Sequence, residues 1–381
     1  MINDGRRTVR KRFILGDKRF FSFVSYLIVI CSLLLTYFAC SSPIGNRTHH
    51  IEKTTQVPDA TLFRFVFLGD TRGDYKADPS CYLAEEPLRK IVKEILDLVP
   101  RPDFVIFNGD MVAKTAYRKA PGKIKRWRSI FQYPMKSNNI PVYTTPGNHV
   151  IDGNATNPDN SMRYIPLFRT YFQADNPMNG PKGYKGVTYS FTYKNCHFVT
   201  VTSFMTHEGY DNRELSPREF VQKKKDFEYF INEKNRRWLK EDLKRDHSDF
   251  TLFFTHCPIY PVGPHYKDKM SLHAHPASRS MIAGILIDDG VHAFFTSHEH
   301  LYARVNLGPS NPVPSGLEGH LLQVIIGSAG APLSSKPARK DMVLEKYKKT
   351  YNYLVADVSS NMIKCVVYDD NGNEIDSFSI F

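Results

Sequence analysis

Short apolar runs bounded by turn residues recur along the chain, and each leads directly into side chains that can bind metal. β-Branched and aromatic residues dominate these runs, a composition typical of buried strands. Five segments share the pattern, and each ends at an aspartate, an asparagine or a histidine: 63–70, 103–110, 140–149, 249–256 and 291–300. The sequence therefore predicts five strands with chemically active ends.

Helical patterns lie between the strands, for example in residues 85–99 and 235–246. Alternating strands and helices favour an α/β fold with a largely parallel sheet covered on both faces. Ligands bind such sheets at the carboxyl ends of the strands, so the candidate chelators are expected at one edge. Near the C-terminus, Asn371-Gly372 joins two strand-like runs and predicts a hairpin.

The side chains at the strand ends form a mixed oxygen and nitrogen ligand set. They are Asp70, Asp110, Asn148, His256, His298 and His300. Such a set suits Mn, Fe or Zn and argues against a structural zinc site built from cysteines. Six protein ligands are too many for one open catalytic ion but suit two ions that share a carboxylate. Paired ions of this kind activate water and clamp a phosphoryl group, so the chemistry that fits best is phosphoester hydrolysis.

The same residues resemble the five sequence blocks of calcineurin-like metallophosphoesterases. The blocks are GD at 69–70, GD at 109–110, GNH at 147–149, TH at 255–256 and SHEH at 297–300. The resemblance covers roughly residues 60 to 381, and residues near its end are similar to the purple acid phosphatase branch. It implies a four-layer αββα sandwich and a two-metal site.

The resemblance also implies a role for each residue. Asp70, Asp110 and His300 would hold the first ion, and Asp110, Asn148, His256 and His298 the second, with Asp110 bridging. His149 would face the substrate and either protonate the leaving oxygen or steady the phosphate. The identity of the two ions, divalent or of mixed valence, stays open between Mn, Fe and Zn.

Several positions depart from the family pattern. Arg72 stands where many members have a histidine, Ala113 where the purple enzymes have a tyrosine, Val150 where an acidic residue is common, and Ser297 where glycine is usual. The first ion therefore lacks one usual protein ligand.

Several other side chains have two interpretations. Arg72 is either a surface residue paired with Asp74 or a guanidinium that binds the phosphate. Asp74 itself is either a compensating ligand or a turn former. His265 is expected in a solvated loop, although it could approach the site. Cys257 is expected to be a small residue at a strand end.

The charge and hydropathy pattern of the N-terminus predicts an export signal. Residues 1–19 hold seven Lys/Arg and two Asp, and no charged residue occurs from Phe20 to Cys40. A basic leader before an apolar stretch directs export, and this stretch is long enough to span a bilayer. Residues 1–40 are thus either a lipoprotein signal cleaved before Cys40 or an uncleaved anchor. Either would tether an extracytoplasmic domain of residues 61–381 through a polar linker of residues 41–60.

The sequence as a whole predicts a membrane-tethered phosphoesterase that hydrolyses phosphomonoesters. Two alternatives remain: a phosphodiesterase acting on nucleotides or lipid headgroups, and a catalytically weakened protein that binds a phosphorylated ligand or a partner. The net charge of +12 comes partly from the leader, and no segment resembles a nucleic-acid-binding module.

Overall fold

The computed structural model describes residues 60–74, 76–78, 80–113, 119–151, 158–203, 231–267, 272, 276–308, 311, 319–334 and 339–381. The predicted signal or anchor and nearly all of the linker lie outside these residues. Among the helices that are described, none is both long enough and apolar enough to cross a membrane.

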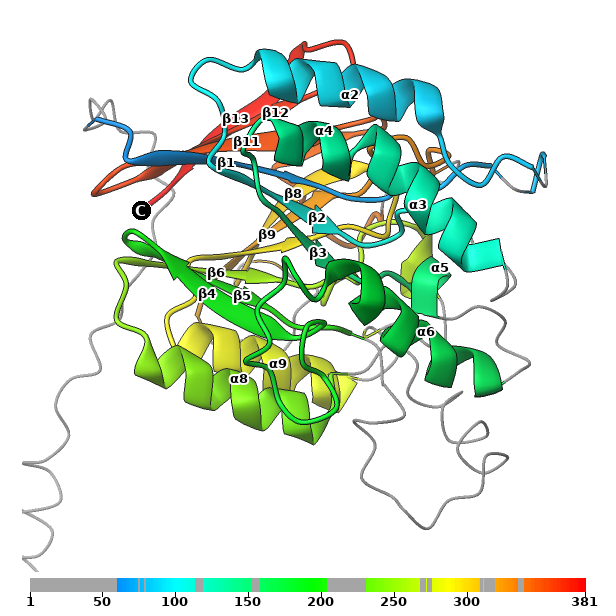
Figure 1. Cartoon of the computed structure of the whole chain (residues 1–381). Coiled ribbons are helices and arrows are strands. Elements are labelled where there is room, and N and C mark those ends of the chain that lie inside the picture. The colour runs from blue at the N-terminus through cyan, green and yellow to red at the C-terminus, as the bar shows by residue number, and fades with distance from the viewer. Residues whose placement is uncertain are drawn as a thin grey trace, which may run out of the picture. The chain divides into compact units, whose positions relative to one another are not determined.

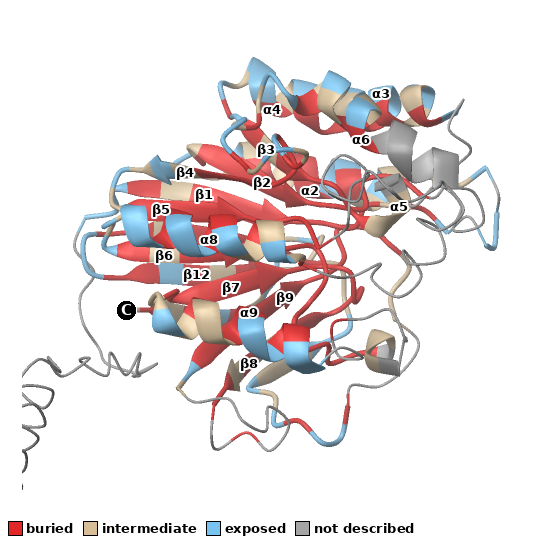
Figure 2. Cartoon of the chain, turned by 90° about the horizontal axis from the view of Figure 1, so that it is seen from below, coloured by how far each residue is buried: buried red, intermediate tan, exposed pale blue. Residues whose placement is uncertain are grey.

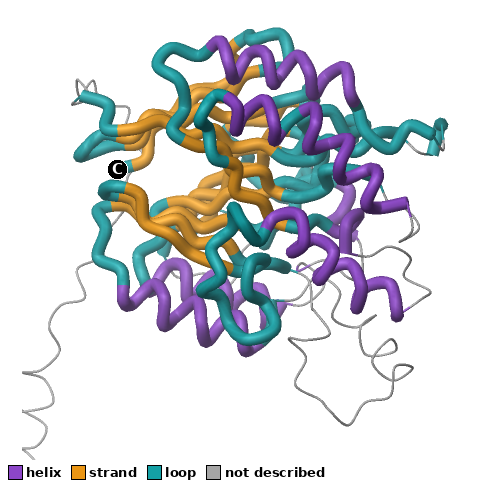
Figure 3. Tube along the Cα trace, in the orientation of Figure 1, coloured by secondary structure: helices purple, strands orange, loops and turns teal. Residues whose placement is uncertain are grey.

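Two mixed sheets form the centre of the described domain (Figures 1 and 3). The first sheet has the order β13 (Glu374–Ile380), β12 (Ile363–Tyr368), β11 (Tyr353–Val358), β1 (Phe63–Leu68), β2 (Phe104–Asn108) and β3 (Val142–Thr145). The second has the order β10 (Lys346–Lys348), β8 (Tyr302–Leu307), β9 (Leu321–Ile326), β7 (Ala293–Thr296), β6 (Phe250–Phe254), β5 (Cys196–Thr200) and β4 (Tyr189–Tyr193).

All five predicted strands are present, but they do not share one sheet. β1, β2 and β3 pair in parallel in the first sheet, whereas β6 and β7 pair in parallel in the second. The prediction of one largely parallel sheet is therefore wrong: there are two sheets, and antiparallel strands complete each of them toward its edges. The predicted hairpin is confirmed: β12 pairs antiparallel with β13, and Gly372 adopts a φ of 78° in the turn.

Helices cover the outer face of each sheet. α2 (Glu85–Asp97), α3 (Ala120–Ile130), α4 (Gln132–Ser137) and α6 (Pro158–Phe172) lie over the first sheet, and α8 (Glu233–Arg245) and α9 (Pro276–Asp288) over the second (Figure 1). The predicted helices at 85–99 and 235–246 correspond to α2 and α8. In α2 the apolar residues recur at helical spacing, so that Leu88, Ile91 and Ile95 are buried against the sheet.

Three apolar cores separate the layers. One lies between the first sheet and its helices, one between the two sheets, and one between the second sheet and α8 and α9. Figure 2 shows the strands largely buried and the outward sides of α8 and α9 exposed. The middle core is aromatic: the rings of Phe65 and Phe198 meet edge to face, with centroids 5.3 Å apart. These cores give the helix–sheet–sheet–helix layering that the resemblance implied.

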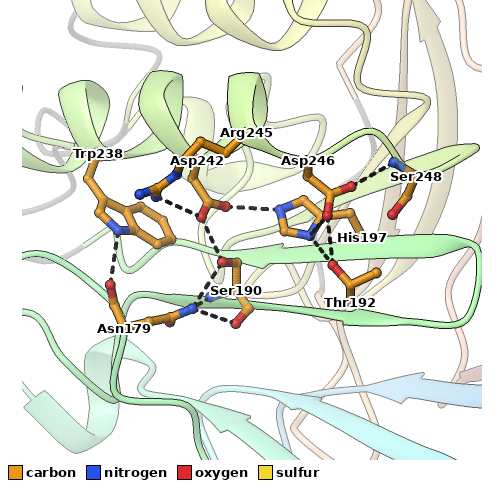
Figure 4. Close-up of polar contacts among 9 residues, drawn as sticks. All are labelled: Asn179, Ser190, Thr192, His197, Trp238, Asp242, Arg245, Asp246 and Ser248. Carbon is orange, nitrogen blue, oxygen red and sulfur yellow. Dashed lines mark hydrogen bonds and ion pairs between the residues drawn. The ribbon is translucent and has the colours of Figure 1, made fainter.

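A partly buried polar cluster, with Ser190, His197 and Asp242 at its buried centre, fixes α8 to the β4–β5 hairpin (Figure 4). His197 lies between two carboxylates, with its Nε2 2.9 Å from Asp242 Oδ2 and its Nδ1 3.2 Å from Asp246 Oδ2. Ser190 donates to Asp242, and Thr192 donates to Asp246. The cluster joins side chains from a hairpin and from the C-terminal end of a helix, so each partner compensates the burial of another.

Removing His197 is expected to destabilise the domain. His197→Leu would remove the imidazole from buried Asp242, which would keep only Ser190 and the largely exposed Arg245 as partners. Loss of one member of a buried pair costs about 3 kcal/mol or more. Urea unfolding at neutral pH measures this loss. Adding Asp242→Asn to the variant should recover part of it, since the uncompensated charge is then gone. His247→Leu, at an exposed neighbouring position, should change the free energy of unfolding little.

The pH dependence of this cluster follows from Asp246. Burial tends to raise the pKa of Asp246, but hydrogen bonds from Ser248 and Thr192 and the charge of His197 hold that pKa below its ordinary value. Asp246 therefore stabilises the fold above the ordinary aspartate pKa of about 4, and this contribution disappears as the pH falls through the lower folded pKa.

Candidate metal centre

The carboxyl ends of β1, β2, β3, β6 and β7 meet at one side of the sheet sandwich. Although the strands belong to two sheets, the ligand atoms of Asp70 and Asp110 from the first sheet lie within 4.8 Å of that of His300 from the second. The structure therefore brings together the three residues expected around the first ion. All three are buried.

Hydrogen bonds orient this first group. Asp70 Oδ2 accepts from the backbone N–H of His298 at 2.8 Å, whereas Asp70 Oδ1 is buried without a hydrogen-bond partner in the described structure. His300 Nδ1 lies 2.8 Å from the carbonyl oxygen of Pro332, so this nitrogen carries the proton. Its Nε2 then presents a lone pair 3.5 Å from Asp70 Oδ1.

The residues expected around the second ion also converge. Asn148 Oδ1 lies 3.3 Å from His256 Nε2 and 3.1 Å from His298 Nδ1. His256 Nδ1 is 2.7 Å from the carbonyl oxygen of Asn108, which fixes the ring and directs Nε2 into the site. Asp110 Oδ2 lies 3.6 Å from His256 Nε2. Asp110 thus contributes to both groups, the position required of a bridge.

Four of these residues have an unusual backbone. Asp70, Asp110, His298 and His300 have φ values of 56°, 49°, 70° and 45°, in the left-handed region that favours glycine. Each follows the end of a strand, where the left-handed turn redirects the side chain toward the site. Backbone strain of this kind is concentrated at functional positions.

Two glycines make room for the carboxylate and the imidazole. A Cβ on Gly147 would lie 2.1 Å from Asp110 Oδ1, and a Cβ on Gly109 would lie 2.4 Å from His256 Nδ1. Gly109 also has a φ of 87°. The glycines of the GD and GNH blocks are thus required by close approach, and at Gly109 by conformation as well.

The electrostatics indicate a site built for positive charge. Burial alone would lower the pKa of His256, but Asp110 and Asp70 outweigh it and raise this pKa to about 9. Burial alone would raise the pKa of Asp110, but His149, His256 and His298 hold it well below its ordinary value. Without a metal, the carboxylates therefore keep a proton on His256. The buried, unsatisfied Asp70 Oδ1 and this retained proton both fit a site for divalent cations.

His149 and Arg72 lie at the same centre. The backbone N–H of His149 donates to Asp110 Oδ1 at 2.8 Å. Burial, followed by the nearby positive charge of Arg72 and others, lowers the pKa of His149 to about 4, although Asp110 opposes this. Arg72 Nη2 lies 3.4 Å from His300 Nδ1. The arginine is therefore beside one of the predicted metal ligands. Asp74 is exposed and accepts from the backbone of Ala77, as expected of a turn former.

Three further residues belong to the site but were not among the predicted ligands. Asn108 connects the two sheets, since its side chain donates to Thr255 O and Ser297 Oγ while Thr145 donates to it. In the sequence, the signal for this role was a polar residue, Asn108, at the end of the otherwise apolar strand β2.

The other two lie next to the His-x-His block. The ring of His265 is 4.3 Å from that of His298, so the expectation of a solvated loop is wrong. Its loop is held close because buried Glu299 accepts from the backbone N–H groups of Val262 and Gly263, at 2.6 and 2.7 Å. In the sequence, the acidic Glu299 between the predicted ligands His298 and His300 was the signal that a neighbouring loop is held at this place.

Comparison with known proteins agrees with this geometry. The model of the calcineurin-like phosphoesterase family matches residues 63–302, more than half of the chain. No curated protein sequence is significantly similar to the chain.

Solved structures share the fold at low sequence identity. A purple acid phosphatase from yellow lupin (Lupinus luteus) seeds is 17% identical with a TM-score of 0.56, over 83% of this chain and 53% of the lupin chain. This chain thus spans about half of that enzyme. A dimetal phosphatase from Danio rerio is 14% identical with a TM-score of 0.54, over 84% of this chain and 99% of the other. GAP50, the anchor in the inner membrane complex of Plasmodium, is 14% identical with a TM-score of 0.50, over 84% and 88%.

Proposed function

Because the chain belongs to the calcineurin-like phosphoesterase family, whose members are metal-dependent phosphoester hydrolases, we propose that it hydrolyses phosphomonoesters at a two-metal site. The observation that carries this proposal is the position of Asp110. Its carboxylate lies among the ligand atoms of Asp70 and His300 on one side and faces His256 on the other. A shared carboxylate between two ligand groups is the arrangement that a pair of ions requires.

The proposed roles follow the two groups. Asp70, Asp110 and His300 would hold the first ion, and Asp110, Asn148, His256 and His298 the second. When bound, the ions would supply Lewis-acid polarisation of the phosphoryl oxygens and lower the pKa of water. The protein's own contribution is to hold these ligands in place before substrate arrives, through the bonds from His256 to Asn108 and from His300 to Pro332.

The groups around the ligands favour a monoester. A phosphomonoester carries two negative charges at neutral pH, and Arg72 adds a permanent positive charge beside His300. His149, whose lowered pKa keeps its ring neutral at neutral pH, can donate one N–H to a phosphoryl oxygen. A phosphodiester carries only one negative charge and two substituents, so the positive charge of Arg72 would attract it less strongly.

The test combines metal analysis with two aryl substrates. Purified full-length protein is loaded with Mn²⁺, Fe²⁺ or Zn²⁺, and hydrolysis of para-nitrophenyl phosphate is compared with that of the bis-ester. Two bound ions with a preference for the monoester would support the proposal. A preference for the diester would instead support a phosphodiesterase at the same centre, and protein that binds no metal would overturn both.

Replacement of Arg72 is expected to weaken phosphate binding. Arg72→Ala should lower kcat/KM by roughly tenfold to a hundredfold, because a charge-assisted bidentate contact contributes about 1.5–3 kcal/mol. Inorganic phosphate should inhibit the variant less, while its metal content stays unchanged. Arg72→Lys should recover only part of the loss, since an ammonium lacks the planar fork. Wild-type inhibition by phosphate in Arg72→Ala would show that the arginine does not bind substrate.

A binding protein without turnover is the second candidate. Arg72 occupies a position where many family members place a histidine ligand, and Ala113 offers no ligand atom. GAP50, which shares the fold, is an anchor in a membrane complex. Metal-loaded protein that binds phosphate tightly but hydrolyses neither ester would favour this candidate over the enzyme.

The proposal includes a location outside the cytoplasm. It is supported by the basic leader and the uncharged stretch from Phe20 to Cys40. Membrane fractionation of cells that express the full chain, compared with a chain that begins at residue 60, tests the tether. Equal recovery of both proteins in the soluble fraction would contradict it.

A further inference from the structure

A cysteine lies among the ligands expected for the second ion. The Sγ of Cys257 and one ring nitrogen each of His256 and His298 all lie within 4.8 Å of one another. Cys257 directly follows His256 at the end of β6, and its side chain is 3% exposed. The thiol is therefore held beside two imidazoles that are buried as well.

A hydrogen bond and a backbone conformation orient the rings of the two histidines. The bond from His256 Nδ1 to Asn108 O sets one ring, and the left-handed backbone of His298 sets the other. Cys257 also packs into the apolar core of the first sheet and its helices, as a small hydrophobic residue would. What sets it apart from a packing residue is the distance of its sulfur from the two imidazoles. Two oriented imidazoles and a thiol within 4.8 Å of one another are donors of the kind found in zinc sites.

The two ligand groups also differ in chemical softness. The group of Asp70, Asp110 and His300 offers two carboxylates and one imidazole, which suit harder ions such as Mn²⁺. A thiolate beside His256 and His298 would favour Zn²⁺ or Co²⁺, because sulfur is a soft ligand.

We propose that Cys257 is a ligand of the second ion, so that this site binds Zn²⁺-class ions through sulfur as well as the nitrogens of His256 and His298 and the oxygens of Asp110 and Asn148. Binding exchanges the thiol proton for the metal, and one proton is released to solvent for each Cys257–metal bond formed. The interpretation of Cys257 as a plain strand-end residue is replaced by this one. The inference rests on the metal centre of the proposed function, but its test is spectroscopic and requires no turnover.

The first experiment uses Co²⁺ as an optical probe. Metal-free full-length protein is titrated with Co²⁺, and a thiolate-to-cobalt charge-transfer band is expected in the near ultraviolet. Cys257→Ser should lose this band while it keeps the visible ligand-field bands, because the histidines and Asp110 remain. Cys365→Ser, at a buried cysteine in the core between the sheets, is the matched control and should keep the band.

Competition titrations with Zn²⁺ measure how much Cys257 contributes to the affinity of the site. Cys257→Ser should bind Zn²⁺ at least about tenfold more weakly than the unmodified protein. Loss of a group that only supports a metal ligand already lowers affinity by about tenfold or more, and here a ligand itself is removed. Its Mn²⁺ affinity should change little, since Mn²⁺ prefers oxygen ligands.

X-ray absorption at the zinc edge tests the unmodified protein and does not depend on how the variant folds. One sulfur scatterer at about 2.3 Å is expected. Zinc surrounded by nitrogen and oxygen alone, or a charge-transfer band that survives in Cys257→Ser, would overturn the inference. Stoichiometric Co²⁺ binding without a thiolate band would overturn it while leaving the proposed enzyme intact. Failure to bind Co²⁺ or Zn²⁺ at all would overturn both.

Discussion

Asp110→Asn is expected to remove most activity and bound metal together. The buried carboxylate lies among Asp70 and His300 and faces His256 of the other group, and its pKa lies well below the ordinary value because of the surrounding histidines. Asparagine has nearly the same shape but offers one neutral oxygen in place of two charged ones. The loss of charge and of one donor atom should lower kcat/KM by roughly a thousandfold, at the upper end of what removal of one preorganised group costs.

Metal analysis and kinetics on the same preparation check this prediction. Asp357→Asn is the matched control, since Asp357 pairs with Arg64 on the same sheet but away from the site. The control should keep full activity and two bound ions. Normal metal content with full turnover in Asp110→Asn would exclude the bridge, whereas loss of activity with normal metal would move the role of Asp110 to the substrate.

Replacement of His149 is expected to cause the second large loss of activity. His149→Ala should lower kcat/KM by roughly a hundredfold, because it removes a donor aimed at the phosphoryl group. The pKa of about 4 means that the ring is mostly neutral at pH 7 in the metal-free protein, so we expect it to steady the phosphate rather than to protonate the leaving oxygen. His149→Gln, which keeps an N–H donor, should then retain much of the activity.

The choice of leaving group separates the two roles of His149. If the residue only binds phosphate, His149→Ala should lose the same factor with an aryl phosphate as with an alkyl phosphate. A general acid matters most when the leaving group is poor, so a much larger loss with the alkyl ester would assign proton transfer to His149. In that case His149→Gln should be as inactive as His149→Ala.

The sequence predicted the strands and the convergence of the candidate ligands well, because both depend on local patterns. A run such as residues 104–108 is apolar enough to read as a buried strand, and the residue that follows it marks the end. All six predicted ligands lie in the two groups, because a strand end fixes the place of the next side chains.

What the sequence could not predict depends on contacts between distant segments. Periodicity does not reveal which strands pair, so the division between β3 in one sheet and β6 in the other stayed hidden. The contact of Glu299 with the backbone near Gly263 joins residues 36 apart through main-chain groups that have no sequence signature. The proximity of His265 to His298 has the same origin, since a folded segment rather than a motif places His265 there. Cys257, in contrast, lies near His298 because it directly follows His256 of the TH block.

The left-handed backbone of the ligands carries a cost in stability. Asp70, Asp110, His298 and His300 each hold a conformation that costs roughly 1 kcal/mol in a residue other than glycine. Together these costs are a large share of the 5–15 kcal/mol by which domains are typically stable. Glycine at any of the four positions would relieve this local backbone cost, although it would also remove side-chain hydrogen bonds such as the one from His298 N–H to Asp70. The chain instead keeps a carboxylate or an imidazole at every one, as expected if these positions are needed to hold the proposed metal ions.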